Sequence, residues 1–252
     1  MASNTWMTAE RVSAPQPTLA ANPNMTEHLV LMCASALFTG LSQRECSEIV
    51  SCARARTFAR DEILFSQGQP VRSLILLQSG SVNHTQVSES GSEVLLRMSG
   101  TGDAVNVQGE AASCSHTCSA RAMEQCRALV WEYSKLQALL TQYPQIRRNI
   151  GRILSARLQE LEERFREVAT EKVAKRLALV LLRLLKQIGK PSAEGIQVSL
   201  SREELAQMTG TTLFTISRVL SRWAEQGFVT PRREAVLVSD LQRLESVSDD
   251  DC

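Results

Sequence analysis

The feature that most constrains this chain is an apolar stripe that recurs at three- and four-residue steps between residues 146 and 168. Pro144 stands just before it, and proline suits the first turn of a helix because the N–H that it lacks has no partner there. At about 3.6 residues per turn, the stripe runs for about six turns. A helix of this length needs an apolar partner along its side, so we predict a helix over 144–170 that pairs with a second copy of the chain. The alternative is a helix that packs only on its own domain. The residues predicted to dimerise are Ile146, Ile150, Ile153, Leu154, Arg157, Leu158, Leu161 and Phe165.

A different pattern precedes the stripe, between residues 56 and 132. Apolar runs of three or four residues, at 63–65, 74–77 and 94–96, alternate with single glycines. Short apolar runs between turn residues predict the strands of an all-β unit. Residues 29–51 have helical spacing and predict short helices in front of it. Residues 1–27, rich in Ala, Ser, Thr, Asn and Pro, predict a disordered arm.

A third pattern follows the stripe. Ser201 and Glu204 have the spacing of a capping box, which predicts a helix over 202–208. Gly210 then permits a tight turn, a second helix is expected over 212–226, and a basic hairpin is expected around 231–234. Two helices joined by a turn with glycine, followed by a basic hairpin, are the outline of a winged helix-turn-helix.

The outer face of the second helix carries the side chains that we predict to contact DNA. Arg218 can bind guanine through two hydrogen bonds, while short hydroxyls reach phosphates or base edges. Arg232 and Arg233 on the hairpin would add phosphate contacts. The full set is Thr211, Thr212, Phe214, Thr215, Ser217, Arg218, Arg222, Arg232 and Arg233.

The charge distribution agrees with a nucleic-acid partner at one end of the chain. Residues 144–245 carry 18 Lys and Arg against 12 Asp and Glu, a local charge of +6, although the whole chain has a formal net charge of only +1. No apolar run approaches the roughly 20 residues that cross a bilayer. The N-terminus has no apolar core of a secretory signal. We therefore expect a cytoplasmic protein without a membrane partner.

Residues 202–220 have the sequence Arg-Glu-Glu-Leu-Ala-Gln-Met-Thr-Gly-Thr-Thr-Leu-Phe-Thr-Ile-Ser-Arg-Val-Leu, and the segment ends at Gly227. This segment resembles the C-terminal domain of the CRP/FNR family (cAMP receptor protein and fumarate-nitrate regulator). The N-terminal half resembles the family's β-roll in Phe65-Ser-Gln-Gly68, in Leu76-Leu-Gln-Ser-Gly80-Ser-Val82, and in Gly91 and Gly102-Asp103. The resemblance covers about residues 29–245. It implies a homodimeric transcription regulator that binds a near-palindromic DNA site and works with RNA polymerase.

The implied fold class is α+β, with a cyclic-nucleotide-binding-type β-roll, a long dimerisation helix and a C-terminal winged helix-turn-helix. The implied division is a disordered arm over 1–27, a sensor domain over 28–143, the dimerisation helix over 144–170, a DNA-binding domain over 171–245 and an acidic tail over 246–252. One position departs from the family pattern. Phe214 stands where the family usually has a glutamate that accepts a hydrogen bond from cytosine, so the usual half-site need not carry over.

The resemblance does not identify the effector, because the branches of the family sense different ones. The cyclic-nucleotide branch carries Phe-Gly-Glu and, about ten residues later, Arg followed by Ser or Thr. These motifs fall on Val105-Asn106-Val107 and His116-Thr117, so both charged partners are missing. A shifted alignment through Gly109-Glu110 supplies a glutamate but no arginine. The pattern therefore argues against cAMP or cGMP.

Two metal-based effectors stay open as alternatives. Cys114, Cys118 and Cys126 offer thiolates for an iron–sulfur cluster, although no cysteine occurs in residues 1–32, where the oxygen-sensing branch places three. Haem is the other alternative, with His116 and Cys118 as axial ligands. The remaining possibilities are another small ligand or none. No catalytic motif occurs, so we expect no enzyme activity. A dimeric effector-binding module whose DNA binding is altered or lost is the alternative function.

Overall fold

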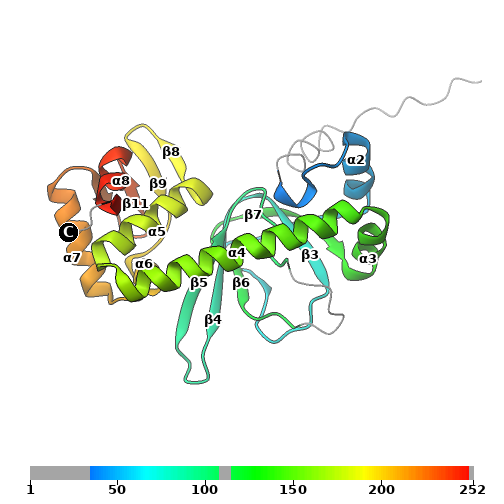
Figure 1. Cartoon of the computed structure of the whole chain (residues 1–252), viewed down its shortest axis with the longest axis horizontal. Coiled ribbons are helices and arrows are strands. Elements are labelled where there is room, and N and C mark those ends of the chain that lie inside the picture. Colours follow the sequence, from blue (N-terminus) through cyan, green and yellow to red (C-terminus); the bar gives the residue numbers. More distant parts are fainter. Residues whose placement is uncertain (1–34, 108–114, 250–252) are drawn as a thin grey trace, which may run out of the picture.

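The computed structural model describes residues 35–107 and 115–249, arranged as two lobes connected by one long helix (Figure 1). The predicted arm over 1–27 lies outside the described residues, and so do Cys114 and Gly109-Glu110. Within the described ranges, no helix is both long enough and apolar enough to cross a membrane.

The N-terminal lobe contains two antiparallel sheets. One sheet has the strand order β1-β7-β3 and the other β2-β6-β4-β5. Phe58, Leu77 and Val82 are fully buried in the core that these strands share. The strands are β1 (Arg54–Phe58), β2 (Ile63–Phe65), β3 (Ser73–Ser79), β4 (Val82–Val87), β5 (Glu93–Ser99), β6 (Ser119–Ala122) and β7 (Cys126–Glu132). The predicted all-β unit is thus confirmed.

Helices cover one end of this lobe and form a second apolar core with β3 and β7. They are the 3₁₀ helix η1 (Ala36–Phe38), α2 (Gln43–Ser51), α3 (Tyr133–Gln142) and the start of α4 (Pro144–Thr170). Trp131 is fully buried there, and its indole N–H donates to the carbonyl oxygen of Ile49 at 2.8 Å. Helix α3 was not predicted from the sequence, because its apolar periodicity is weak and the segment is short between strand β7 and Pro144.

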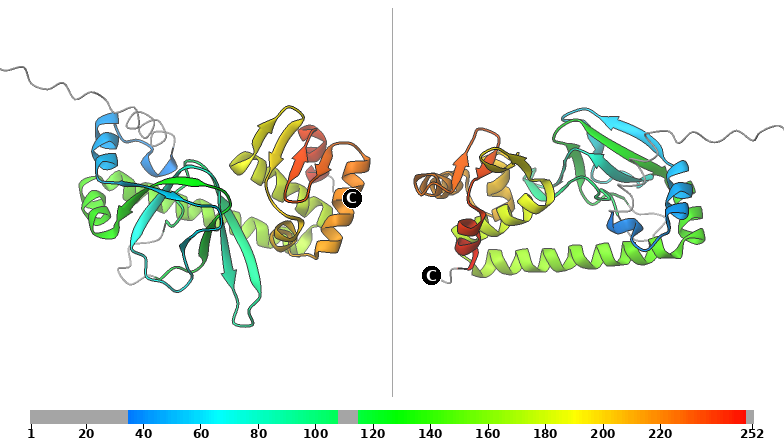
Figure 2. Two further views of the ribbon diagram at one scale, coloured as in Figure 1. Left: turned by 180° about the vertical axis from the view of Figure 1, so that it is seen from behind. Right: turned by 90° about the horizontal axis from the view of Figure 1, so that it is seen from above.

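Helix α4 begins at Pro144, as predicted, and runs along one side of the N-terminal lobe to the other lobe (Figure 2, right). The apolar stripe divides into two parts. Ile146 is buried, and Ile150, Ile153 and Leu154 pack against the N-terminal core. Further along, four apolar side chains are exposed: Leu158, Leu161, Phe165 and Val168.

The C-terminal lobe is a winged helix-turn-helix. Its sheet has the strand order β10-β11-β9-β8. Its elements are α5 (Val173–Ile188), β8 (Lys190–Ser192), β9 (Gly195–Val198), α6 (Arg202–Thr209), α7 (Leu213–Glu225), β10 (Val229–Pro231), β11 (Val236–Val238) and α8 (Leu241–Asp249). The predicted capping box is confirmed, since Ser201 and Glu204 each accept a hydrogen bond from the other's backbone N–H. The tail predicted over 246–252 is wrong as far as residue 249, because α8 continues through it and Val247 packs on the core.

The two lobes share apolar contacts through strand β5. Its pairing with β4 shifts register between Thr85, which faces Leu95, and His84, which faces Arg97, so Leu96 is one extra residue on β5. A bulge of this kind breaks the alternation of side chains along a strand. Leu95 and Met98 are buried in the core of the C-terminal lobe, together with residues of α5 and α6.

Gly210 tests the helix-turn-helix geometry. It ends α6 in the left-handed conformation, with φ 61° and ψ 45°. That conformation costs a residue with a Cβ roughly 1–2 kcal/mol. We expect Gly210→Ala to lower the free energy of unfolding by about 1 kcal/mol, and Gly210→Asn to recover part of that loss because asparagine tolerates this region. Urea unfolding followed by circular dichroism at one protein concentration measures both variants. Equal stability of Gly210→Ala and the wild type would contradict the described turn.

Candidate functional site

The first candidate surface is the outer face of α7. Thr212 caps the helix, and its side-chain oxygen accepts a hydrogen bond from the N–H of Thr215 at 3.2 Å. Ile216, Leu220 and Trp223 are buried against the lobe, which leaves the opposite side of α7 free. Exposed or half-buried on that side are Thr211, Thr212, Phe214, Thr215, Ser217, Arg218 and Arg222. The predicted DNA-contacting residues of α7 thus share one face.

A shallow depression lies on this face, lined by Phe214, Ser217, Arg218, Ser221, Arg222 and Glu225. The ring of Phe214 is 75% exposed at the N-terminal end of the helix. An aromatic ring offers apolar contact, for which the thymine methyl is the matching group in the major groove. Two guanidinium groups, of Arg218 and Arg222, lie beyond it on the same face.

The two arginines of the hairpin between β10 and β11 differ in their surroundings. Arg232 donates to Gln197 at 2.8 Å and pairs with Glu194 at 3.1 Å, so its guanidinium is already engaged. Arg233 is exposed. Glu234, next along the chain, pairs with Arg60 of the N-terminal lobe at 3.2 Å. Of the two predicted phosphate contacts, Arg233 is therefore the more available.

The second candidate site is a cavity of about 490 Å³ between the β-roll and α4. Val105, Asn106, Val107, His116 and Thr117 all line it, so the positions aligned with the cyclic-nucleotide motifs lie in its wall. None of these five side chains carries the carboxylate or guanidinium of those motifs. The other lining residues are Phe65, Gln86, Leu96, Arg97, Cys118, Leu154, Arg157, Glu160, Leu161 and Arg164.

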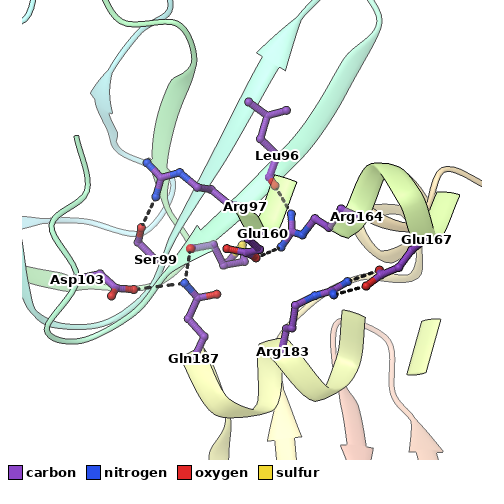
Figure 3. Close-up of polar contacts among 10 residues, drawn as sticks. Leu96, Arg97, Ser99, Asp103, Glu160, Arg164, Glu167, Arg183 and Gln187 are labelled. Atoms are coloured by element: carbon purple, nitrogen blue, oxygen red, sulfur yellow. Dashed lines mark hydrogen bonds and ion pairs between the residues drawn. The ribbon is translucent and has the colours of Figure 1, made fainter. Parts of the chain in front are cut away.

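Three arginines reach this cavity from β5 and α4. Arg97 donates to the hydroxyl of Ser99 at 2.9 Å and to the carbonyl oxygen of Val105 at 2.6 Å. Arg157 donates to the carbonyl oxygen of Ala104 at 2.6 Å. Arg164 donates to the carbonyl oxygen of Leu96 and pairs with Glu160 at 2.7 Å (Figure 3).

Arg97 and Arg164 were not predicted from the sequence, and Arg157 was assigned to the dimerisation stripe. The signal was a charged residue inside an apolar run, since Arg97 interrupts Val94-Leu95-Leu96 and Met98, and Arg157 interrupts the stripe of α4. The structure turns Arg157 toward the backbone of its own β-roll.

Behind the cavity wall lies a neutral polar cluster. His84 is fully buried, with Nε2 2.9 Å from the hydroxyl of Ser99 and Nδ1 3.8 Å from the sulfur of Cys118. Burial, and then the nearby charges of Arg97 and Arg157, hold the pKa of His84 well below its ordinary value of 6.5. Burial likewise raises the pKa of the Cys118 thiol, although Arg97 opposes this. Both groups are therefore uncharged at neutral pH.

The metal ligands predicted from sequence are only partly brought together. Within 35–107 and 115–249, no group of three or more His, Cys, Asp or Glu side chains is placed to share a metal ion. Cys126 is buried at the start of β7, and its thiol donates to the carbonyl oxygen of Ser81 at 3.3 Å. The iron–sulfur cluster at Cys114, Cys118 and Cys126 stays a prediction, because Cys114 lies outside the described residues. His116 and Cys118 do share the cavity, and the buried Nδ1 of His116 has no hydrogen-bond partner among the described residues. A haem at this pair stays a prediction.

Comparison with known proteins agrees with this architecture. Residues 55–143 match the cyclic nucleotide-binding domain, and residues 175–247 match the Crp-like helix-turn-helix domain. The CRP-like cAMP-activated global transcriptional regulator of Mycobacterium tuberculosis is 24% identical over 216 residues, which cover 85% of this chain and 96% of that protein. The cyclic AMP receptor protein of Thermus thermophilus is 29% identical over 217 residues, which cover 86% of this chain and 98% of that protein. FixK2 from Bradyrhizobium japonicum shares the fold, with a TM-score of 0.67 at 20% identity over 79% of this chain and 99% of that chain.

A β-roll cavity and a winged helix-turn-helix in one chain define the class: this is a DNA-binding transcription regulator that couples an effector signal to DNA binding. The chain belongs to the CRP/FNR family of transcription regulators. The resemblance, the α+β fold class and the expected role of a DNA-binding regulator with an effector domain are thereby confirmed.

The burial of His84 predicts a pH dependence of stability. The unfolded chain binds a proton at His84 near pH 6.5, whereas the folded chain does so only at lower pH. The contribution of neutral His84 to the free energy of unfolding is therefore complete above pH 6.5, and it is lost as the pH falls toward the lowered pKa. Between pH 6.5 and 5.5 the wild type should lose up to about 1 kcal/mol more than His84→Gln. Urea unfolding of both proteins across this range measures the difference, and parallel pH profiles would contradict it.

Proposed function

We propose that this regulator acts as a homodimer that reads a near-palindromic DNA site through Ser217, Arg218 and the unusual Phe214. The observation that carries the proposal is the pairing of two exposed features: the α7 face with its arginines, and the apolar end of α4. The first offers charge and base-edge contacts to DNA. The second offers a surface that a second copy can cover.

The exposed part of α4 supports the dimer. Leu158, Leu161 and Phe165 are 56%, 60% and 76% exposed, and they follow each other at three- and four-residue steps. A row of large apolar side chains along one helix face is unfavourable in water and is typical of a helix–helix interface. Ile146, Ile150, Ile153 and Leu154, also predicted to dimerise, instead pack on their own lobe. The proposed interface is therefore the C-terminal half of the stripe.

The contacts between the lobes support coupling of the cavity to the DNA-binding surface. The side-chain amide of Gln187 in α5 donates to the carbonyl oxygen of Met98 at 2.7 Å and to Asp103 at 3.3 Å (Figure 3). Both carboxylate oxygens of Glu167 in α4 accept from Arg183 in α5 at 2.7 Å (Figure 3). A ligand that moves β5 or α4 would thus change the pose of the winged helix-turn-helix.

Because its partner is DNA, we expect the regulator to act in the cytoplasm, with RNA polymerase as its second partner in transcription. No catalytic role is part of the proposal. The alternative is a dimeric effector-binding module whose DNA binding is altered or lost. It rests on Phe214 alone, and binding to duplex DNA would contradict the loss.

Arg218 provides the test of DNA reading. We expect Arg218→Ala to weaken binding to the preferred duplex by about 10- to 100-fold, since one bidentate arginine–guanine contact is worth roughly 1–3 kcal/mol. The duplex is first selected from a random library, and affinity is then measured by fluorescence anisotropy at fixed salt. Arg127→Ala, which removes the same charge from an exposed position on β7, is the matched control and should bind like the wild type. Equal losses in both variants would mean that Arg218 contributes only charge.

Phe165 provides the test of the dimer. Burial of one such ring contributes roughly 2 kcal/mol, and a two-fold interface contains it twice. Phe165→Glu should therefore raise the dimer dissociation constant by about 1000-fold or more, which sedimentation velocity measures. Gln159→Glu, a charge added to another exposed face of α4, should leave the dimer intact. A wild-type protein that sediments as a monomer at micromolar concentration would overturn the dimer.

A further inference from the structure

We propose that the effector of the β-roll cavity is an amphiphilic organic anion whose charge is bound by Arg97, Arg157 and Arg164. This inference rests on the proposed function, because it names the chemical class of ligand for the same sensor site. It depends on side chains of β5 and α4, outside the segments that align with the cyclic-nucleotide motifs.

The charge balance of the cavity wall carries the proposal. Three guanidinium groups line the cavity, against one carboxylate, that of Glu160, which is paired with Arg164. Among the described residues, Arg97 and Arg157 form no ion pair. Their hydrogen bonds go to the Ser99 hydroxyl and to backbone carbonyl oxygens. Asp103 and Glu160 act on both arginines only at longer range, so within the described ranges neither guanidinium has a carboxylate in direct contact.

The burial of two guanidinium groups without a counter-charge is unfavourable in free energy. Burial, together with the neighbouring Arg157, lowers the pKa of Arg97 to about 10. A charged group removed from water requires a partner of opposite charge or several hydrogen bonds. An anion placed between Arg97 and Arg157 would accept hydrogen bonds from guanidinium N–H groups on both sides. Such charge-assisted hydrogen bonds are among the strongest hydrogen bonds in proteins.

The rest of the wall selects an apolar body for the ligand. Leu96, Val105, Val107, Leu154 and Leu161 contribute aliphatic surface. The rings of Phe65 and His116 are stacked, with centroids 3.8 Å apart and planes inclined by 13°. A volume of about 490 Å³ suits a compact organic molecule better than a bare inorganic ion. The shared chemistry is a carboxylate or phosphate ester on an aromatic or aliphatic group.

The same arginines connect the ligand to the winged helix-turn-helix. Arg164 bonds the carbonyl oxygen of Leu96, the extra residue of the β5 bulge (Figure 3). Arg97 bonds Ser99, whose strand buries Leu95 and Met98 in the C-terminal lobe. An anion that draws the guanidinium groups toward itself would therefore act on the strand on which the DNA-binding lobe rests.

The test uses the full chain and two dyes that differ in charge. One is 8-anilinonaphthalene-1-sulfonate, and the other is its neutral analogue N-phenyl-1-naphthylamine. We expect Arg97→Gln and Arg157→Gln each to weaken binding of the sulfonate by about tenfold or more, because each removes a charge-assisted contact, and to change binding of the neutral dye by less than about twofold.

Two further variants separate charge from folding. Arg152→Gln, which removes an exposed arginine from the same helix, should bind both dyes like the wild type. Arg97→Lys keeps the charge and should retain most of the sulfonate binding, so that a loss in Arg97→Gln cannot be ascribed to packing. Circular dichroism and thermal unfolding report whether each variant is folded.

Competition identifies the anion. Displacement of the sulfonate by phenylacetate supports a carboxylate effector, and displacement by phenyl phosphate supports a phosphate ester. Equal binding of both dyes that none of the arginine variants changes would overturn the proposal. So would a haem absorption band in the purified protein that is lost in His116→Ala. Neither result bears on DNA affinity, so the anion proposal and the proposed function fail separately.

Discussion

The arrangement of both lobes depends on one extra residue in strand β5. With regular alternation, Leu95 and Arg97 would share a face and Leu96 and Met98 the other. The bulge at Leu96 breaks this pattern. Leu96 and Arg97 line the cavity, while Leu95 and Met98 are buried among residues of α5 and α6. One short strand thus belongs both to the sensor wall and to the core of the DNA-binding lobe.

The contacts that join the lobes differ in strength, and this difference determines where movement costs little free energy. The Glu167–Arg183 pair is largely buried and has two parallel hydrogen bonds. Loss of one partner from such a pair typically costs about 3–5 kcal/mol, because the other charge stays buried. The Arg60–Glu234 pair is about two-thirds exposed on both sides, and such pairs contribute roughly 0–1 kcal/mol. The angle between α4 and α5 is therefore held firmly, whereas the wing hairpin is held only weakly to the N-terminal lobe.

Local rules predicted much of this structure. The capping box of Ser201, the turn at Gly210 and the start of α4 at Pro144 each depend on neighbours in sequence, and each lies where it was expected. The division of the α4 stripe could not be predicted, since periodicity gives the face of a helix but not what covers it. The cavity arginines were missed for a related reason. Arg97 and Arg157 are far apart in sequence, and only the fold brings their guanidinium groups to one wall.

This placement of charge bears on how an effector would act. The segments aligned with the cyclic-nucleotide motifs still line the cavity, yet at Val105, Val107 and His116 they carry no formal charge, and burial lowers the pKa of His116 further. The cations stand on β5 and α4, which are the elements that contact α5 and α6. In the proposed site, a bound anion would therefore pull directly on the elements that position the recognition helix. A charge held only by a loop would have to transmit its effect through that loop first. The same few residues would then bind the ligand electrostatically and orient the DNA-binding lobe by their packing.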